Sequence, residues 1–235
     1  TLVHSVGGWA ALVAVILLGA RIGKIKDGKV QAIPGHNIPL ATAGVLILWL
    51  GWFGFNGGSV LSADPELTSL TLVTTCIAAA AGGVFAAITS TVVFKNLDLT
   101  MFLNGILGGL VGITAGADQM SPADAVWIGA IAGVLIVSAV SLIDRLKLDD
   151  PVGAIAVHLV CGIWGTLAVG IFGALASTEQ FVSQLIGVGA YAVACVLSSI
   201  IIIGGLKKIS GIRVSEKEER QGLDIHEHGM SAYSK

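Results

Sequence analysis

The sequence has 235 residues, of which 54% are hydrophobic and only 12% are charged, with a formal net charge of -2 and a mean hydropathy of +0.89. An ordinary soluble domain carries about 25% charged residues, so this composition excludes one. The small net charge also excludes a basic surface for nucleic acid.

Apolar runs long enough to cross a bilayer recur along the chain, since a spanning helix needs about 20 such residues. We expect helices near residues 1–20, 38–60, 68–94, 100–117, 123–143, 151–176 and 181–206. Turn residues separate these runs, as in Asp64-Pro65 and Asp150-Pro151. The runs lack the alternation of membrane strands. The sequence therefore predicts an all-α integral membrane protein with about seven helices.

Small residues recur at four-residue spacing within these runs, which predicts helix faces that pack closely. The pairs are Gly105/Gly109, Gly108/Gly112 and Gly129/Gly133. The three cysteines, Cys76, Cys161 and Cys195, lie far apart in apolar runs and are interpreted as packing residues.

Basic residues occur only in every second loop and in the tail. They are Arg21, Lys24, Lys26, Lys29, Lys95, Arg145, Lys147, Lys207, Lys208, Arg213 and the later tail residues. The other loops hold Asp64, Glu66, Asp118, Asp124 and Glu179 without Lys or Arg. The positive-inside rule then predicts cytoplasmic basic loops and a cytoplasmic C-terminus, with residue 1 outside. We expect a transmembrane domain over 1–206 and a cytoplasmic tail over 207–235.

The first apolar run starts at Thr1 without an initiator Met or an interfacial flank. We therefore expect the chain to be the later part of a longer protein.

Two histidines, His4 and His158, lie inside the predicted spans. An ionisable residue at membrane depth suggests a function, and imidazole can handle protons. A histidine bonded to a neighbouring carbonyl in the core explains the pattern equally well. At 1.5 Å per residue, His4 lies about 25 Å from Arg21 and His158 about 10 Å from Pro151, so this count does not bring them together.

The aromatic segment 49–59 approaches the end of the second run. Its Trp residues either anchor the helix at the interface or present a ring, such as that of Trp52, to an outer vestibule. In the second case the ring would attract a small cation, and the Ser59 hydroxyl would accept its N–H. We assign Trp52 and Ser59 to substrate recruitment on this second interpretation.

The acidic pair Asp149 and Asp150 precedes the sixth run, where helix capping is the favoured role and cation attraction the alternative. The mixed charges of residues 213–229 are typical of a solvated surface, and His226 and His228 are disfavoured as metal ligands.

Five separated runs carry a family resemblance: residues 1–8, 34–39, 51–59, 149–162 and 222–233. Together they resemble the ammonium transporter family (Amt/MEP/Rh), and most closely its bacterial and archaeal Amt branch. The resemblance implies an eleven-helix fold of two inverted five-helix repeats plus a last helix, with one pore in each protomer of a homotrimer. The chain would run from within the fifth helix to the eleventh.

The resemblance also assigns roles to single residues. It places the twin pore histidines at His4 and His158, a gating Phe at Phe55, and the recruiting hydroxyl at Ser59. It matches the acidic pair to Asp149 and Asp150. It places the regulatory tail, a contact site for a PII-type signalling protein, around Gly222, Leu223 and Asp224. Gly153 departs from the pattern, because some relatives carry a carboxylate there.

We therefore expect a multi-pass protein of the cell membrane that takes up ammonium for nitrogen supply and uses no cofactor, no metal and no catalytic residue. NH4+ would lose its proton, and NH3 would pass the two histidines. The expected partners are ammonium or ammonia, further copies of the chain, a PII-type protein and lipid, and no nucleic acid. The alternatives are an ammonium sensor signalling through its tail, an intramembrane metal enzyme and a carbon dioxide channel.

Overall fold

The computed structural model describes residues 1–233. Its helices are α1 (His4–Leu18), α2 (Ile38–Ser59), α3 (Pro65–Phe94), α4 (Leu99–Ile113), α5 (Pro122–Arg145), the π-helix η1 (Ile155–Val160), α6 (Cys161–Ala168), α7 (Thr178–Ile209), α8 (Glu216–Gln221) and α9 (Leu223–His228). Two short strands, β1 (Ile25–Lys26) and β2 (Lys29–Val30), form an antiparallel hairpin after α1. The prediction of an all-α membrane fold is confirmed, and the hairpin is a local addition that the sequence did not signal.

Side-chain caps fix where most of the long helices begin. Asn37, Asp64, Asp98, Ser121 and Ser177 each accept a backbone N–H from the first turn of the helix that follows. Such caps pair donors that have no partner within the helix. Six of the seven predicted helices therefore begin and end within four residues of their expected positions.

The run 151–176 is the exception. Residues 151–153 are not helical, Ala154, η1 and α6 together cover only 154–168, and turns follow up to Ser177. The helix starts late because Asp150 accepts N–H bonds from three later residues and holds a loop there.

The centre of the bundle is the contact between α3, α4 and α5, where glycines let the backbones touch. A Cβ added at Gly105 or Gly109 of α4, or at Gly129 or Gly133 of α5, would collide with the Ala78 or Gly82 carbonyl oxygen of α3. The predicted packing role of these four glycines is confirmed. Gly108 faces Ile136, and Gly112 has only ordinary contacts.

Among residues 1–233, four helices are long and apolar enough to cross a membrane: α2, α3, α5 and α7. Helices α1 and α4 have 15 residues each and are apolar but shorter. Most large apolar residues of α2 and α7 face outward. This is the pattern of a multi-pass membrane protein whose outer helices contact lipid or other membrane segments.

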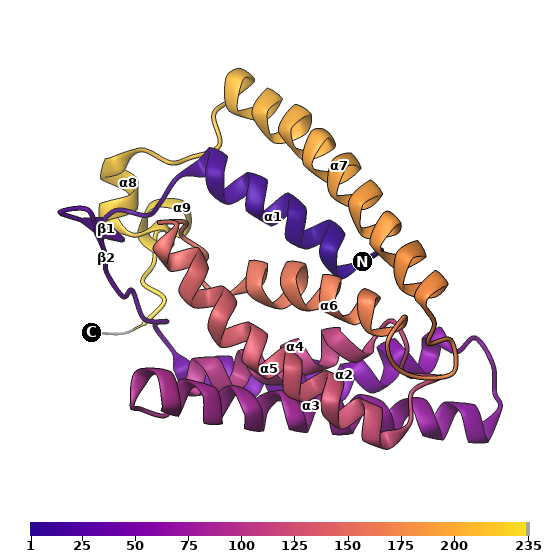
Figure 1. The fold of residues 1–235 in the computed structure, drawn as a ribbon. Coiled ribbons are helices and arrows are strands. Elements are labelled where there is room, and N and C mark those ends of the chain that lie inside the picture. Colours follow the sequence, from indigo (N-terminus) through magenta and orange to yellow (C-terminus); the bar gives the residue numbers. More distant parts are fainter. Residues whose placement is uncertain (234–235) are drawn as a thin grey trace.

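The basic segments gather at one end of the bundle. Figure 1 shows the hairpin, α8 and α9 beside the C-terminal end of α5. Lys24 pairs with Asp144 at 3.0 Å, and Lys207 donates to the Leu17 carbonyl. These bonds join the ends of α1, α5 and α7, which places their Lys and Arg residues on one side.

Candidate functional site

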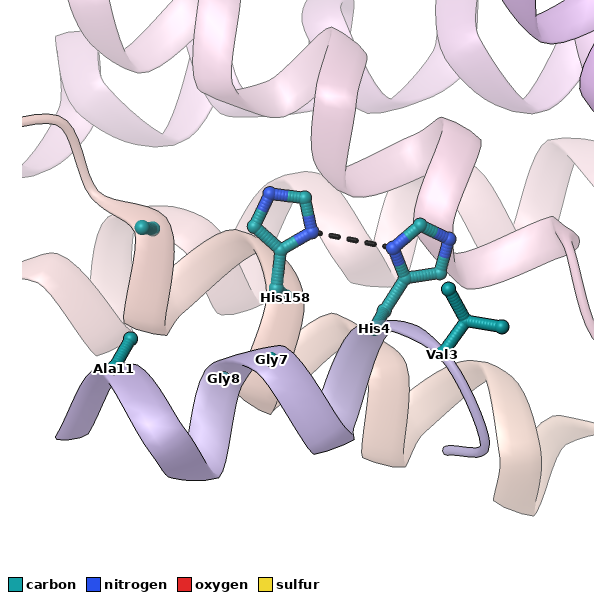
Figure 2. A pocket seen from close by; sticks show the side chains of 7 residues that line it. Val3, His4, Gly7, Gly8, Ala11 and His158 are labelled. Carbon is teal, nitrogen blue, oxygen red and sulfur yellow. Dashed lines mark hydrogen bonds between the residues drawn. The ribbon is translucent and has the colours of Figure 1, made fainter. Parts of the chain in front are cut away.

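The structure brings His4 and His158 together. His4 opens α1 and His158 lies in η1, and their Nδ1 atoms are 3.2 Å apart (Figure 2). The two rings are stacked, with centroids 5.4 Å apart and an angle of 16° between their planes. Because a hydrogen bond needs one donor and one acceptor, only one of the two Nδ1 atoms carries the proton in this pair.

Two glycines allow this meeting. A Cβ added at Gly8 would lie 2.5 Å from the Leu159 amide nitrogen, and one at Gly162 would lie 2.7 Å from Ser5 Oγ. The backbones of α1 and η1–α6 are therefore in contact, and the helices run in opposite directions. This crossing sets His4 opposite His158.

The depth count from the sequence failed for a physical reason. It treated residues 151–158 as helix at 1.5 Å per residue. Residues 151–153 are instead non-helical, and the chain turns there around the Asp150 carboxylate. A count along one straight helix therefore does not give the depth of His158.

Two aromatic rings complete the wall beside His4. The Trp52 ring stacks on His4 with centroids 5.3 Å apart, and the Phe55 ring lies 5.8 Å from His4 and 5.5 Å from Trp52. Phe55 remains 43% exposed, whereas Trp52 is only 8% exposed. Trp52 also donates its Nε1–H to Thr114 Oγ1 at 3.0 Å.

The structure places the Trp52 side chain in the interior of the protein. The ring is buried and stacks on His4, and the part of Trp52 in substrate recruitment stays a prediction. The indole N–H of Trp52 donates to Thr114, the residue that follows α4, and one face of the ring covers His4. Trp52 therefore packs inside the protein beside His4. The exposed aromatic ring of this segment next to His4 is that of Phe55.

A cavity of about 260 Å³ adjoins the histidine pair. It is lined by Val3, His4, Gly7, Gly8, Ala11, Ala154 and His158. Apart from the two imidazoles its walls are apolar or glycine, as Figure 2 shows. His4 Nε2 is buried and has no hydrogen-bond partner within residues 1–233. A small neutral molecule with N–H groups would find its polar contacts here at the imidazoles.

Ser59 lies apart from this pair, at the far end of α2. Its hydroxyl donates to the Phe55 carbonyl oxygen at 2.6 Å, and its side chain borders a second, more polar cavity. The hydroxyl proton is therefore used within the helix, and the oxygen is left as an acceptor.

The acidic pair divides into two roles. Asp150 caps η1, accepting N–H bonds from Gly153, Ala154 and Ile155 at 2.7–3.1 Å. Asp149 instead binds Arg21: the Nε and Nη2 atoms donate to its two oxygens at 2.7 and 2.8 Å, and the Arg21 amide donates at 2.9 Å. The hydrogen bond from Arg21 holds the pKa of Asp149 below its usual value. Capping, the favoured prediction, describes Asp150, while Asp149 forms an ion pair.

The structure also explains the departure at Gly153. This residue has φ +79°, and an added Cβ would lie 2.8 Å from Asn104 Nδ2. A side chain is strained there both by the backbone conformation and by the neighbour. The glycine fits the loop that Asp150 closes.

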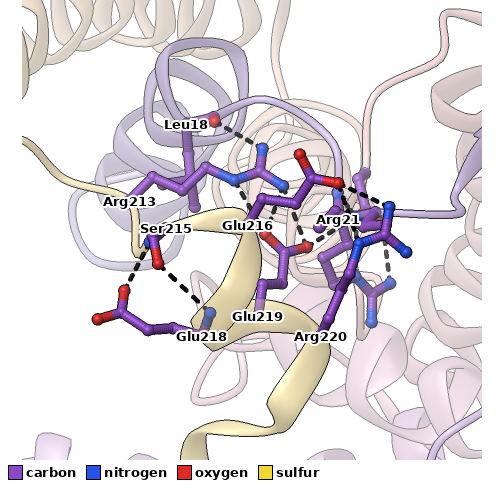
Figure 3. A network of polar contacts seen from close by, with 10 residues as sticks. Leu18, Arg21, Arg213, Ser215, Glu216, Glu218, Glu219 and Arg220 are labelled. Carbon is purple, nitrogen blue, oxygen red and sulfur yellow. Dashed lines mark hydrogen bonds and ion pairs between the residues drawn. The ribbon is translucent and has the colours of Figure 1, made fainter. Parts of the chain in front are cut away.

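The tail is attached to the end of α1 (Figure 3). Arg213 donates to the Leu18 carbonyl oxygen and pairs with Glu219, which accepts the Ile22 N–H at 2.7 Å. That N–H bond lowers the pKa of Glu219 below its ordinary value, and Arg213 adds to the effect. The tail and the end of the His4 helix are thus joined by hydrogen bonds, and the ion pair between Arg213 and Glu219 lies within the tail.

The predicted tail residues form the hinge between α8 and α9. Gly222 has φ +100°, a conformation that favours glycine, and Asp224 accepts the Ala232 N–H at 2.9 Å. Leu223 begins α9 and is exposed. His226 pairs with Glu218 at 2.8 Å. In the part of the chain that the structure describes, no three His, Cys, Asp or Glu side chains are grouped as metal ligands would be.

Comparison with known proteins identifies the family of the chain. The profile of the Ammonium Transporter Family matches residues 1–233. The chain belongs to this family. Ammonium transporter Amt2 of Archaeoglobus fulgidus is 42% identical over 249 residues, covering 98% of the chain and 53% of the relative. The chain spans about half the length of the curated relatives it matches.

Solved structures of the family share the fold. A structure titled "Sensor Amt Protein" superposes with a TM-score of 0.91 at 41% identity, covering 96% of this chain and 58% of that one. The Mep2 structure of Candida albicans superposes with a TM-score of 0.84 at 28% identity, covering 92% and 51%. The predicted family and the partial Amt fold are therefore confirmed.

Sequence reasoning missed three contributors to these sites. The sequence pattern uses Arg21 only to predict which side of the membrane its loop lies on, although Arg21 forms an ion pair with Asp149. Thr114 and Asn56 received no role, although Thr114 holds Trp52 and Asn56 is a buried amide in an apolar helix. A lone amide within a span was the available signal for Asn56, because polar groups in membrane helices are costly.

Proposed function

We propose that the complete protein transports ammonium. NH4+ is recruited at the end of the bundle that carries Ser59, loses a proton near Phe55, and passes as NH3 along the cavity beside His4 and His158. The observation that carries this proposal is the 3.2 Å contact between the two imidazoles on an otherwise apolar cavity wall.

The apolar wall supports deprotonation before passage. A cation in an apolar pore would lose its hydration without adequate replacement, at a cost of several kcal/mol or more. Neutral ammonia avoids this cost and needs only hydrogen bonds from the imidazoles. Phe55, at the edge of this wall and partly exposed, is proposed as the gate that a hydrated cation does not pass.

The histidine pair also provides a route for the released proton. If one Nδ1 donates to the other, the donor's Nε2 is an acceptor and the acceptor's Nε2 is a donor. The pair is then a short chain with one accepting end and one donating end. A proton taken up at the first end and released at the second makes transport electrogenic.

Replacement of both histidines tests the proposal. In the complete protein reconstituted in proteoliposomes, we expect His4→Leu/His158→Leu to reduce the ammonium-dependent current to background. His228→Leu is the matched control, because the exposed side chain of this histidine forms no hydrogen bond or ion pair with any residue in 1–233. Undiminished current in the double variant would refute the role of the pair.

The remaining expectations belong to the same proposal. We assign the basic end of the bundle to the cytoplasm of the cell membrane, because the charge asymmetry follows the positive-inside rule. We propose a homotrimer, and a PII-type protein that contacts the tail near Gly222, Leu223 and Asp224. The transmembrane part is residues 1–206, and the regulatory part is 207–235.

An ammonium sensor is the second candidate, and one observation favours it. The structure titled "Sensor Amt Protein" has the same fold over 96% of this chain. A transporter and a sensor differ in flux, so methylammonium uptake into cells that lack their own transporters separates them. Uptake that saturates with a high turnover supports transport, whereas ammonium binding without uptake supports the sensor.

A further inference from the structure

Two neighbouring glycines of α1, Gly7 and Gly8, have different surroundings. A Cβ added at Gly8 would lie 2.5 Å from the Leu159 amide nitrogen, whereas one at Gly7 would meet nothing within 4 Å. A glycine inside a helix is less stable than alanine, because its backbone loses more conformational freedom on folding. Close packing explains the glycine at position 8. No contact with residues 1–233 requires the glycine at position 7.

The cavity beside the histidine pair lies on the Gly7 side of α1. It is lined by Val3, Gly7 and Ala11, which follow one another at four-residue spacing. With about 3.6 residues per turn, such residues form one stripe along a helix. Gly8 lies on the other side of His4, where η1 packs against α1. Figure 2 shows Gly7 between Val3 and Ala11, so a side chain at this position would extend into the cavity.

The open space beside Gly7 lies close to the nitrogen atoms that an amine would contact. At about 1.5 Å per residue, Gly7 is about 4.5 Å along α1 from His4. Ammonia bonded to an imidazole needs no more room than its own hydrogens. The methyl group of methylamine needs a space next to the nitrogen, against an apolar wall. The stripe offers this space at Gly7, and its other two members, Val3 and Ala11, have apolar side chains.

We propose that Gly7 determines the size of the amine that passes the histidine pair. With glycine at this position the cavity admits a methyl-substituted amine in addition to ammonia, and with a larger side chain it admits ammonia alone. The inference rests on the proposed function and adds a selectivity determinant to it. Gly7 acts through the width of the cavity, whereas His4 and His158 act through hydrogen bonds.

The ratio of methylammonium uptake to ammonium-dependent current tests this role, with both measured on the complete protein in proteoliposomes. Gly7→Ala adds one methyl group to the wall. We expect the ratio to fall about tenfold, the lower limit for one misfitting methyl group in an apolar pocket. Gly7→Val should lower the ratio further and reduce the ammonium current as well. Gly189→Ala is the matched control, because a Cβ there also meets nothing within 4 Å and this residue of α7 does not line the cavity.

Ala11→Gly provides the opposite change, because it removes a methyl group from the same stripe. We expect the ratio to rise by up to about tenfold. Poor folding does not produce a gain in relative methylammonium uptake. This variant therefore keeps the test decisive if Gly7→Val does not fold.

The outcomes separate the inference from the proposed function. A wild-type protein without ammonium current refutes the function. A wild-type ammonium current without methylammonium uptake refutes only the role of Gly7, and so does an equal ratio in the wild type and Gly7→Ala. A lower melting temperature of Gly7→Ala would also overturn the inference, because Gly7 would then pack against another helix of the complete protein instead of facing open space.

Discussion

Asp149 is the buried charge whose surroundings the structure defines best. Its two oxygens accept both guanidinium donors of Arg21 and a backbone N–H, and its side chain is almost fully buried. A carboxylate removed from water in this way needs a matched partner, because the loss of hydration is large. Arg21 provides that partner and connects the end of α1 to the loop before η1.

This ion pair predicts a pH dependence of stability. The pKa of Asp149 is lower in the folded protein than its ordinary value of 3.8, so the unfolded chain binds the proton first as pH falls. The pair's contribution is complete above that value and disappears as pH drops through the folded pKa. We expect Asp149→Asn to cost about 2 kcal/mol near neutral pH, allowing for the partial exposure of Arg21.

Thermal unfolding in detergent between pH 7 and pH 3 would measure this difference. Comparing the variant with the wild type cancels the titration of other carboxylates. The gap between the two should be constant down to about pH 5 and should close below the ordinary pKa. A gap that is equally large at pH 3 would contradict the ion-pair account.

At this scale the sequence predicted residue types better than residue partners. His4, His158, Trp52 and Ser59 could be selected because polar or aromatic groups stand out in apolar runs, and Phe55 was selected through the family resemblance. The roles of all five residues remain proposals. The sequence pattern does not tell which face of a helix contacts which neighbour. That contact decides whether a Trp side chain lies at the membrane interface or packs inside the protein.

At the scale of helices, the crossing of α1 with η1 and α6 is what positions the histidines. The contact depends on Gly8 and Gly162, which let the two backbones touch. In membranes such close contacts replace the hydrophobic effect as the force that holds helices together. The distance between the His4 and His158 rings therefore depends on two glycines that have no functional side chain.

Gly8→Ala should therefore destabilise the protein by about 1–3 kcal/mol, the range for overpacking a tight contact. The neighbouring Gly7→Ala is the matched control for stability, because a Cβ there would meet nothing within 4 Å. That change should be neutral or stabilising, since alanine favours helix by about 0.5–1 kcal/mol. Thermal unfolding of both variants checks the contrast, and equal midpoints would show that the crossing tolerates a wider separation.

Helix positions were predictable because caps and charge-free runs are local signals. Asp64, Asp98 and Ser121 mark helix starts that the structure confirms. The loop of residues 151–153 was not predictable by the same logic. Pro151 looks like a first-turn proline, and only the three N–H bonds to Asp150 show that the helix starts later.

At the scale of the whole molecule, the one-sided distribution of basic residues has a structural counterpart. The ends of α1, α5 and α7 are bonded to one another through Lys24, Lys207 and Arg213. The sequence predicted this grouping because charge asymmetry follows the membrane and needs no knowledge of contacts. It did not predict that the tail binds α1, since residues 190 or more positions apart share no local signal.

The attachment of the tail to α1 gives the last prediction. Glu219 accepts the Ile22 N–H and pairs with Arg213, which holds the Leu18 carbonyl (Figure 3). Glu219→Ala removes both contacts without lowering helix propensity. We expect amide hydrogen exchange of Ile22 and of α8 to become roughly three- to tenfold faster, as for the loss of partly exposed charge-assisted hydrogen bonds.

Glu216→Ala is the control, because Glu216 pairs with Arg220 inside the tail and does not contact α1. Faster exchange in both variants would mean that α8 itself has melted, whereas faster exchange in Glu219→Ala alone would show that this carboxylate holds the tail against the helix that carries His4.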